Sequence, residues 1–272
     1  MPPPASRTCV AFTGMIAASL AVACRTVPGS AEPVFIDGRA VAVVDDSLLA
    51  FTRQGDASVI IRDRGTDAVY TRGAPTLRSP RHVQEMGGRW YVSDMSADGP
   101  LIVVFDAGWT VQRVIRLADL DAVAHEFAVL PNGKIVVESG DGRLVAIGED
   151  STSTFALAEQ GPRPGLLLAV SGGVLHAVPQ RQITLYNGNG HIRWRLPWPW
   201  REDAYVSDIG VDSSGRIHVL GGESGEPPDF VCFTLSATTG EVLRWSAPGP
   251  AATFTVDRIG EIRPDSVSHW LQ

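Results

Sequence analysis

The side chains whose types and spacing suggest chemistry are a pair of aspartates and two histidines. Asp208 and Asp212 lie four residues apart in a stretch that ends in a glycine. A carboxylate is a hard oxygen ligand for calcium and, once desolvated, a general base. His82 and His125 stand at the predicted starts of two strands, and with Asp208 they could form the mixed nitrogen–oxygen site that zinc accepts. The alternative is structural: Asp212 caps a hairpin turn, and Asp208 is solvated at the start of a strand.

A second group of residues is suited to recognition. Residues 194–203 contain three of the seven tryptophans, and prolines flank two of these three. Rigid aromatic side chains on an exposed loop are typical contacts for a sugar, a peptide or a protein. The residues predicted to bind are Trp198, Trp200, Arg81, His82, Asp94 and Tyr205. The alternative is that the tryptophan loop folds down and plugs one end of the molecule.

The composition excludes several classes of protein. The chain has 272 residues, with 23 basic and 30 acidic side chains and a net charge of −7. Nucleic-acid binding requires a basic surface, so no nucleic-acid partner is expected. The sequence contains no nucleophile elbow, P-loop, dinucleotide-binding or EF-hand pattern. The main interpretation therefore needs no cofactor, whereas calcium or zinc belongs to the alternative. Cys232 alternates into a predicted strand as a small buried hydrophobe.

The first segment of the sequence predicts export. Residues 8–24 carry no charge, and an apolar run that ends in small residues is typical of a secretory signal. Its end, Ala-Val-Ala-Cys24, resembles the lipobox of bacterial lipoproteins. The resemblance implies a signal peptide over residues 1–23, an acylated Cys24 and a tether over 24–32, with the protein in the cell envelope (periplasm or outer membrane). The membrane is then touched only through the lipid anchor. A secreted chain without lipid and an uncleaved anchor are the alternatives.

A repeat of about forty residues indicates the fold. A turn followed by an apolar strand recurs at Gly38, Gly88, Gly133, Gly173, Gly215 and Gly260. Glycine suits the positive φ that such hairpin turns require. Four strands rich in valine, isoleucine and aromatic residues accompany most turns, which is typical of a β-propeller blade. The sequence thus predicts an all-β, six-bladed propeller over residues 33–272, whose ring is closed by strands from both termini.

Two stretches resemble known propeller families. Residues 79–106 resemble an NHL-type repeat, which implies a six-bladed propeller of the NHL or TolB-like type. Such propellers include scaffolds, lyases and lactonases, so the fold does not determine the function. The D-x-x-x-D-x-x-G stretch resembles that of calcium-dependent gluconolactonases. This second resemblance implies that Asp208 binds the metal and takes part in proton transfer, and it places the family's Asn-Asp pair on His125 and Glu126.

Two functions are therefore predicted. The first is a non-catalytic envelope binding or scaffold propeller that presents residues 197–208, 94–99 and 118–126 to a protein, a peptide or a glycan. The alternative is a lactonase-like, metal-dependent hydrolase or lyase, with Asp208, His125 and Glu126 as catalytic residues and with Asp208, His82 and His125 around the metal. For Asp94, which is also among the residues predicted to bind, and for Glu138, the structural interpretation is a hairpin-end carboxylate. His176 and His218 are predicted to be packed sheet residues. Residues 116–130 have helical composition, and a short helix is expected there.

Overall fold

The computed structural model describes residues 34–36, 39–43, 48–52, 57–63, 66, 68–120, 126–158, 161, 164–170, 172–198, 205–211, 215–223, 229–249, 254–256 and 262–264. Within these ranges, no helix has both the length and the apolar character needed to cross a bilayer. The predicted signal, tether and acylated Cys24 lie outside the described residues, as do Trp200, His125 and Asp212.

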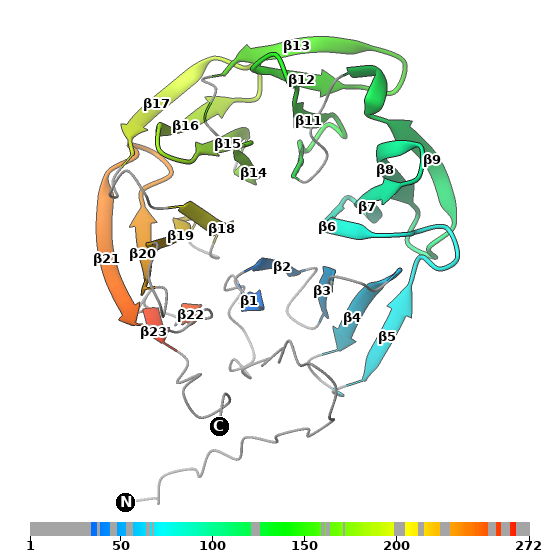
Figure 1. Cartoon of the computed structure of the whole chain (residues 1–272), viewed down its shortest axis with the longest axis horizontal. Coiled ribbons are helices and arrows are strands. Elements are labelled where there is room, and N and C mark those ends of the chain that lie inside the picture. The colour runs from blue at the N-terminus through cyan, green and yellow to red at the C-terminus, as the bar shows by residue number, and fades with distance from the viewer. Residues whose placement is uncertain are drawn as a thin grey trace, which may run out of the picture.

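Four antiparallel sheets of four strands each stand around a common axis (Figure 1). In chain order their strands are β6 (Pro80–Met86), β7 (Arg89–Ser96), β8 (Gly99–Phe105), β9 (Val111–Arg116), β10 (Ala128–Val129), β11 (Ile135–Glu138), β12 (Arg143–Ile147), β13 (Thr152–Leu157), β14 (Leu166–Val170), β15 (Gly173–Val178), β16 (Gln182–Asn187), β17 (Ile192–Pro197), β18 (Tyr205–Val211), β19 (Ile217–Glu223), β20 (Asp229–Leu235) and β21 (Val242–Gly249). Strands pair in chain order within each sheet. These sheets are the predicted four-stranded blades.

The rest of the ring differs from the prediction. One seven-stranded sheet occupies the sector between β18 and β6, since β18 contacts β2, and β2 and β3 contact β6. Its strands, in spatial order, are β23 (Ile262–Pro264), β22 (Phe254–Val256), β1 (Val34–Ile36), β2 (Arg39–Val43), β3 (Leu48–Thr52), β4 (Val59–Asp63) and β5 (Val69–Arg72). The prediction of six blades is wrong, because β1 pairs with both β2 and β22, and the terminal strands therefore extend this sheet. The prediction that strands from both ends share one sheet is confirmed.

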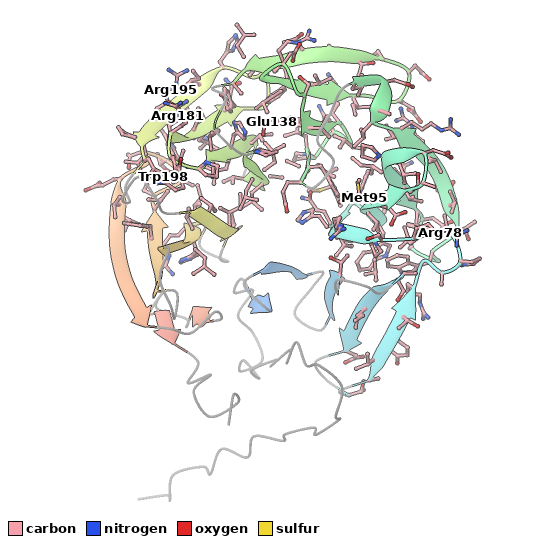
Figure 2. The ribbon with its side chains drawn as sticks, in the orientation of Figure 1. Arg78, Met95, Glu138, Arg181, Arg195 and Trp198 are labelled. Carbon is pink, nitrogen blue, oxygen red and sulfur yellow. The ribbon has the colours of Figure 1, made fainter. Side chains whose placement is uncertain are left out.

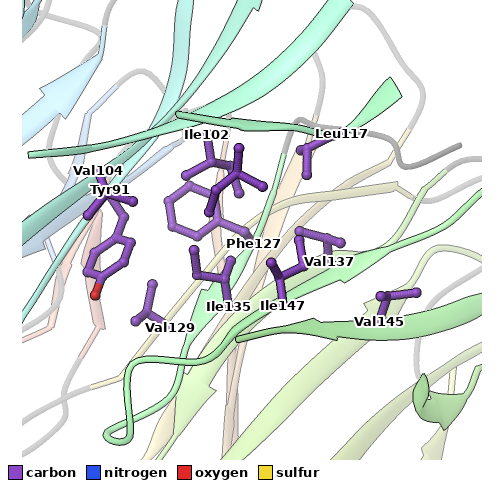
Figure 3. Packing of buried hydrophobic residues seen from close by; sticks show 11 residues of the cluster. Tyr91, Ile102, Val104, Leu117, Phe127, Val129, Ile135, Val137, Val145 and Ile147 are labelled. Carbon is purple, nitrogen blue, oxygen red and sulfur yellow. The ribbon is translucent and has the colours of Figure 1, made fainter. Parts of the chain in front are cut away.

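Apolar side chains fill the spaces between neighbouring sheets. Successive residues of a strand point to opposite faces, so on β7 Tyr91 packs toward the blade that contains β11, whereas Trp90 and Val92 pack toward the seven-stranded sheet. Figure 3 shows the first of these clusters, with Phe127 at its centre. Trp194 on β17 is buried in the interface between the blade of β14–β17 and the blade of β18–β21, and its indole N–H donates to the carbonyl of Ala237 at 3.0 Å.

Residues 116–130 contain little helix. The described part holds a 3-10 turn, η1 (Ala118–Leu120), followed by the short strand β10. The N–H of Leu117 bonds to the carbonyl of Pro100 at 2.9 Å, and Phe127 is buried in the blade interface. Tertiary packing therefore overrides the helical propensity of these residues.

Candidate functional site

The loops on one side of the ring connect the second strand of a blade to its third, and the fourth strand to the next blade. We call this side the loop face; its described loop residues are 73–79, 97–98, 117–120, 126–127, 139–142, 158, 161, 164–165, 179–181 and 198. The innermost strands β6, β10, β14 and β18 all begin there, because every blade has the same antiparallel order. Loops held by a rigid scaffold are where binding sites are commonly built. Figure 2 shows side chains from several blades around this ring.

His82 and Glu126 come from neighbouring blades and meet beside the inner strands. The His82 Nδ1 lies 3.4 Å from a Glu126 carboxylate oxygen, and the two side chains are 20% and 27% exposed. The imidazole also packs edge-on against the ring of Phe127, with the ring centres 5.0 Å apart. A carboxylate on one ring nitrogen fixes the orientation of a histidine. The structure therefore brings together two of the residues named by the hydrolase interpretation.

Asp94 is buried at the end of β7, with 1% of its surface exposed. Its carboxylate accepts the backbone N–H of Ser79 at 2.6 Å and that of Arg78 at 3.1 Å. These two residues immediately precede the inner strand β6. Asp94 thus holds the loop that enters β6, a more specific role than that of the predicted hairpin-end carboxylate. Because it is buried and its oxygens accept these N–H groups, it supports the loop face from within.

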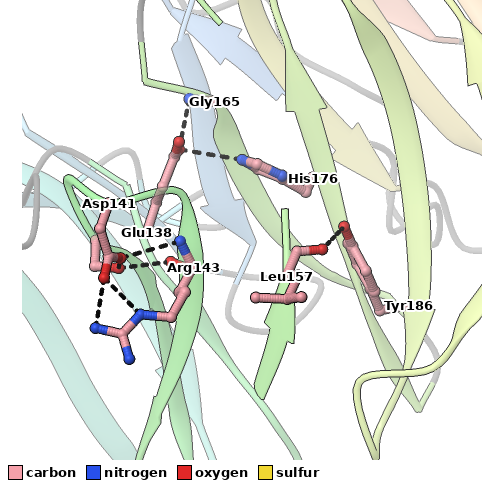
Figure 4. Close-up of polar contacts among 8 residues, drawn as sticks. Glu138, Asp141, Arg143, Leu157, Gly165, His176 and Tyr186 are labelled. Carbon is pink, nitrogen blue, oxygen red and sulfur yellow. Dashed lines mark hydrogen bonds and ion pairs between the residues drawn. The ribbon is translucent and has the colours of Figure 1, made fainter. Parts of the chain in front are cut away.

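Glu138 is the corresponding carboxylate at the end of β11, and it is 7% exposed. One of its oxygens accepts the backbone N–H of Gly165 at 2.7 Å and lies 3.1 Å from Nε2 of His176 (Figure 4). Gly165 immediately precedes β14, so Glu138 fixes the entry of the next blade's inner strand. His176 is 1% exposed and His218 is fully buried, which confirms both as packed sheet residues. The pairing of His176 with Glu138 was not expected from the sequence.

Arg81 occupies a β-bulge at the start of β6. Pro80 pairs with Asp94 and His82 pairs with Ser93, which leaves Arg81 as the extra residue. Bulges re-aim a side chain and often lie beside binding sites. The Arg81 side chain is half-buried, and its Nε is shielded from solvent. Among the described residues, none forms a hydrogen bond or an ion pair with this guanidinium.

A second bulge lies at the same place on β18. Val206 pairs with Gly221 and Asp208 pairs with Leu220, so the residue between Val206 and Asp208 is the extra one. Asp208 therefore takes the position on its inner strand that His82 takes on β6. The side chains of Asp208 and Tyr205 lie outside the described residues.

The tryptophan loop begins beside another arginine. The backbone N–H of Trp198 donates to the carbonyl of Arg181 at 3.0 Å, and the indole packs partly buried against the core between the third and fourth blades. Arg181 itself is exposed and follows Gln180, whose φ is +62°. Trp198 thus combines features of both predicted interpretations, since it covers the core and borders the loop face.

An exposed charged pair lies in the loop after β11. Arg143 donates from Nε to Asp141 at 2.6 Å, and the hydroxyl of Ser139 donates to the same carboxylate at 2.5 Å. These hydrogen bonds, with Arg143 the larger cause, lower the pKa of Asp141 from 3.8 to about 2. The same pair raises the pKa of Arg143.

The described residues hold no group of three or more histidine, cysteine, aspartate or glutamate side chains arranged to bind a metal ion. Of the three predicted metal ligands, the structure describes the side chain of His82, which lies beside the predicted catalytic residue Glu126; the side chains of His125 and Asp208 lie outside the described residues. The structure therefore describes only part of the predicted metal site.

No protein-family profile matches the chain, and no curated protein matches it. Solved structures do match it. A nidogen–laminin complex is 13% identical over 76% of this chain and 79% of that chain, with a TM-score of 0.57. The WD40 β-propeller domain of Doa1 is 14% identical over 86% and 89%, with a TM-score of 0.53. The gluconolactonase XC5397 from Xanthomonas campestris is 15% identical over 65% and 66%, with a TM-score of 0.51.

These likenesses show the β-propeller fold. The chain spans between 53% and 66% of the length of four of the structures that it matches, the gluconolactonase among them. At this level of identity the fold is what the proteins share.

Proposed function

We propose that this protein is a non-catalytic binding propeller of the bacterial cell envelope, and that its loop face takes a protein, a peptide or a glycan. The observation that carries the proposal is that buried carboxylates hold the loops of this face in place. Asp94 and Glu138 are buried carboxylates at the entries of inner strands, where Asp94 accepts two backbone N–H groups and Glu138 accepts one. A preorganised surface loses less entropy when it binds. One of the matched structures is itself a protein–protein complex.

The groups on this face suit a polar ligand. Arg81, the paired His82 and Glu126, and the partly buried Trp198 come from three successive blades. Aromatic and arginine side chains are the residue types that most often dominate binding energy at interfaces. Asp94 contributes by fixing the loop around Arg78 and Ser79.

Site-specific photo-crosslinking tests which face binds. Ala97 and Ala107 are both exposed turn residues at opposite ends of β8, and only Ala97 lies on the loop face. A photoreactive amino acid at position 97 of the full chain, expressed in the cell envelope, is expected to give a defined adduct, identifiable by mass spectrometry as protein, peptide or glycan. The same group at position 107 is the matched control. Equal labelling from both positions, or labelling from 107 alone, would contradict the proposal.

The envelope location is part of this proposal and rests on the lipobox-like sequence. We infer that Cys24 carries the lipid and that the membrane is contacted through it. Mass spectrometry of the membrane fraction is expected to find acylated Cys24, and Cys24→Ser is expected to release the protein from that fraction. An unmodified Cys24 in a membrane-associated protein would reject the anchor.

The second candidate is a metal-dependent hydrolase or lyase. Two observations favour it: His82 meets Glu126 across the blades, and Asp208 takes the register position on β18 that His82 takes on β6. The full chain, purified without chelator, would then carry about one equivalent of calcium or zinc, and EDTA would lower its thermal midpoint. Asp208→Ala would abolish both effects. Protein without metal and without a response to EDTA rejects this candidate.

A further inference from the structure

Arg81 carries a charge that no described neighbour neutralises. Its guanidinium has no hydrogen-bond or ion-pair partner among the described residues, and its Nε is shielded from water. An arginine side chain stays charged in proteins and offers five N–H donors. The two Nη atoms are not shielded, so the charged head of the side chain is open to an acceptor from outside the chain, whereas the shielded Nε is a donor without an acceptor, which is costly.

The described carboxylates nearest to Arg81 in the strand pairing are already engaged. Asp94 pairs across from Pro80, the residue before Arg81, but its oxygens accept the N–H groups of Arg78 and Ser79. Glu126 is directed to the imidazole of His82. The backbone carbonyl of Arg81 is held by the hydroxyl of Thr52 at 2.7 Å, which fixes the main chain of the bulge. The strand is thus anchored while the side chain is left uncompensated.

We propose that Arg81 is the anchor for an oxyanion, a carboxylate or phosphate group, carried by the ligand of the loop face; this inference rests on the binding function proposed above. The planar guanidinium fork matches both groups and forms charge-assisted hydrogen bonds with them. Because Nε is shielded, the oxyanion approaches end-on, toward the two Nη atoms. The bulge places Arg81 at the start of the inner strand β6, at the end of the blade where the loops of the face converge.

A purely structural role for Arg81 makes a different prediction. Arginine also covers apolar surface with its methylene stem while its head stays in water. In that case the charge is incidental, anions have no specific effect on the protein, and substitutions at position 81 act through packing alone.

The test uses the full chain with inorganic phosphate and with acetate as probes, near neutral pH and at constant ionic strength. At an anion concentration about twenty times the dissociation constant, the thermal midpoint of the wild-type protein is expected to rise by about 4–7 °C. Arg81→Gln is expected to remove this rise. Arg81→Lys is expected to reduce it, since lysine keeps the charge and loses the fork. Without anion, both variants are expected to melt at or above the wild-type midpoint.

Arg78→Gln is the matched control, because Arg78 is an exposed arginine three residues away and its loss changes the net charge equally. It is expected to keep the full anion response. A rise with phosphate alone, or with acetate alone, identifies which oxyanion the site takes. A wild-type protein that responds to neither probe, or an Arg81→Gln variant that responds as the wild type does, overturns the proposal; Arg81→Lys decides if the glutamine variant fails to fold.

The anion response and the photo-crosslinking assay are independent. If the crosslink from position 97 forms while the anion response is absent, the anchor is rejected and the binding face stands. If phosphate or acetate binds through Arg81 and no crosslink forms, the anchor stands and the proposed class of partner is rejected.

Discussion

Replacing Glu138 with alanine removes the carboxylate that accepts hydrogen bonds from both Gly165 and His176, at 2.7 and 3.1 Å. The two donors remain buried, and each unsatisfied donor costs about 1–3 kcal/mol. Breaking a buried, hydrogen-bonded pair typically costs about 3–5 kcal/mol in total. We therefore expect the free energy of unfolding to fall by about 3–5 kcal/mol, which corresponds to about 6–20 °C in the midpoint for a domain of this size.

Glu85→Ala is the matched control. One oxygen of Glu85 accepts the backbone N–H of Gly88, also at 2.7 Å, but this bond lies in an exposed hairpin. Water replaces the lost acceptor there, so the expected cost is about 0.5–1 kcal/mol. Comparing the two variants thus separates the effect of losing a hydrogen bond from the effect of its burial.

Equilibrium urea unfolding of Glu138→Ala, His176→Ala and the double variant measures the coupling between the two side chains. A direct pair predicts a coupling of about 1–3 kcal/mol. Glu138→Gln keeps one acceptor oxygen and is expected to cost less than the alanine variant. The reasoning fails if Glu138→Ala costs no more than Glu85→Ala, or if the double variant is simply additive.

The remaining predictions concern two turn glycines and one exposed aspartate. Gly190 has a φ of +82°, and a Cβ there would run into the carbonyl oxygen of Phe155; Gly190→Ala is expected to cost more than about 3 kcal/mol in urea unfolding. Gly172→Ala, with a φ of +77° and no atom within 4 Å of the added Cβ, is expected to cost only the backbone strain, about 1–2 kcal/mol. The pKa of Asp141 is lowered on folding by Arg143, so the charged form stabilises the native state above pH 3.8, and this contribution is lost as the pH falls toward about 2. The stability difference between wild type and Asp141→Asn is expected to shrink across that window in acid-unfolding curves, and a difference that does not change with pH would contradict it.

The strand pattern was predictable because its causes are local. Gly88, Gly133 and Gly215 all have positive φ, as the repeat predicted, and each lies where a first strand turns into a second. Between β14 and β15, the residue with positive φ is Gly172, one position before the predicted Gly173. The alternation of apolar side chains and the residue preferences of turns both depend on a few neighbouring residues, so the sequence alone predicts them.

The blade count was not predictable from these causes. Whether β1 pairs with β2 alone or also with β22 depends on partners more than two hundred residues apart in sequence. Pairing of this kind is decided by the closure of the ring, and turn residues carry no information about it. The repeat therefore predicts strands and their order within a blade better than it predicts how the last sector is shared.

The roles of the buried carboxylates were hidden for a similar reason. Asp94 and Glu138 each lie near the end of a second strand, where a solvated hairpin-end carboxylate is the default expectation. What buries Glu138 is Gly165 and His176, which lie 27 and 38 residues later in the chain. One signal was present: His176 lies within the strand Gly-Val-Leu-His-Ala-Val, all of whose residues are buried, and a buried imidazole requires a polar partner. The preceding blade offers such a partner in Glu138.

The two sides of the ring differ in how they are built, and this difference bears on which one binds. On the side opposite the loop face, the glycines in the turns between first and second strands, 87, 88, 133, 172 and 215, have open space around them. On the loop face, two carboxylates are desolvated to hold the entries of β6 and β14, and desolvation of a charge is costly even when it is hydrogen-bonded. Exposed hairpins would close the blades at lower cost, as the turns between first and second strands do on the other side. Such costly fixation is expected where the geometry of the loops matters for binding. The ligand is therefore expected at the loop face, where the uncompensated Arg81 lies among the fixed loops.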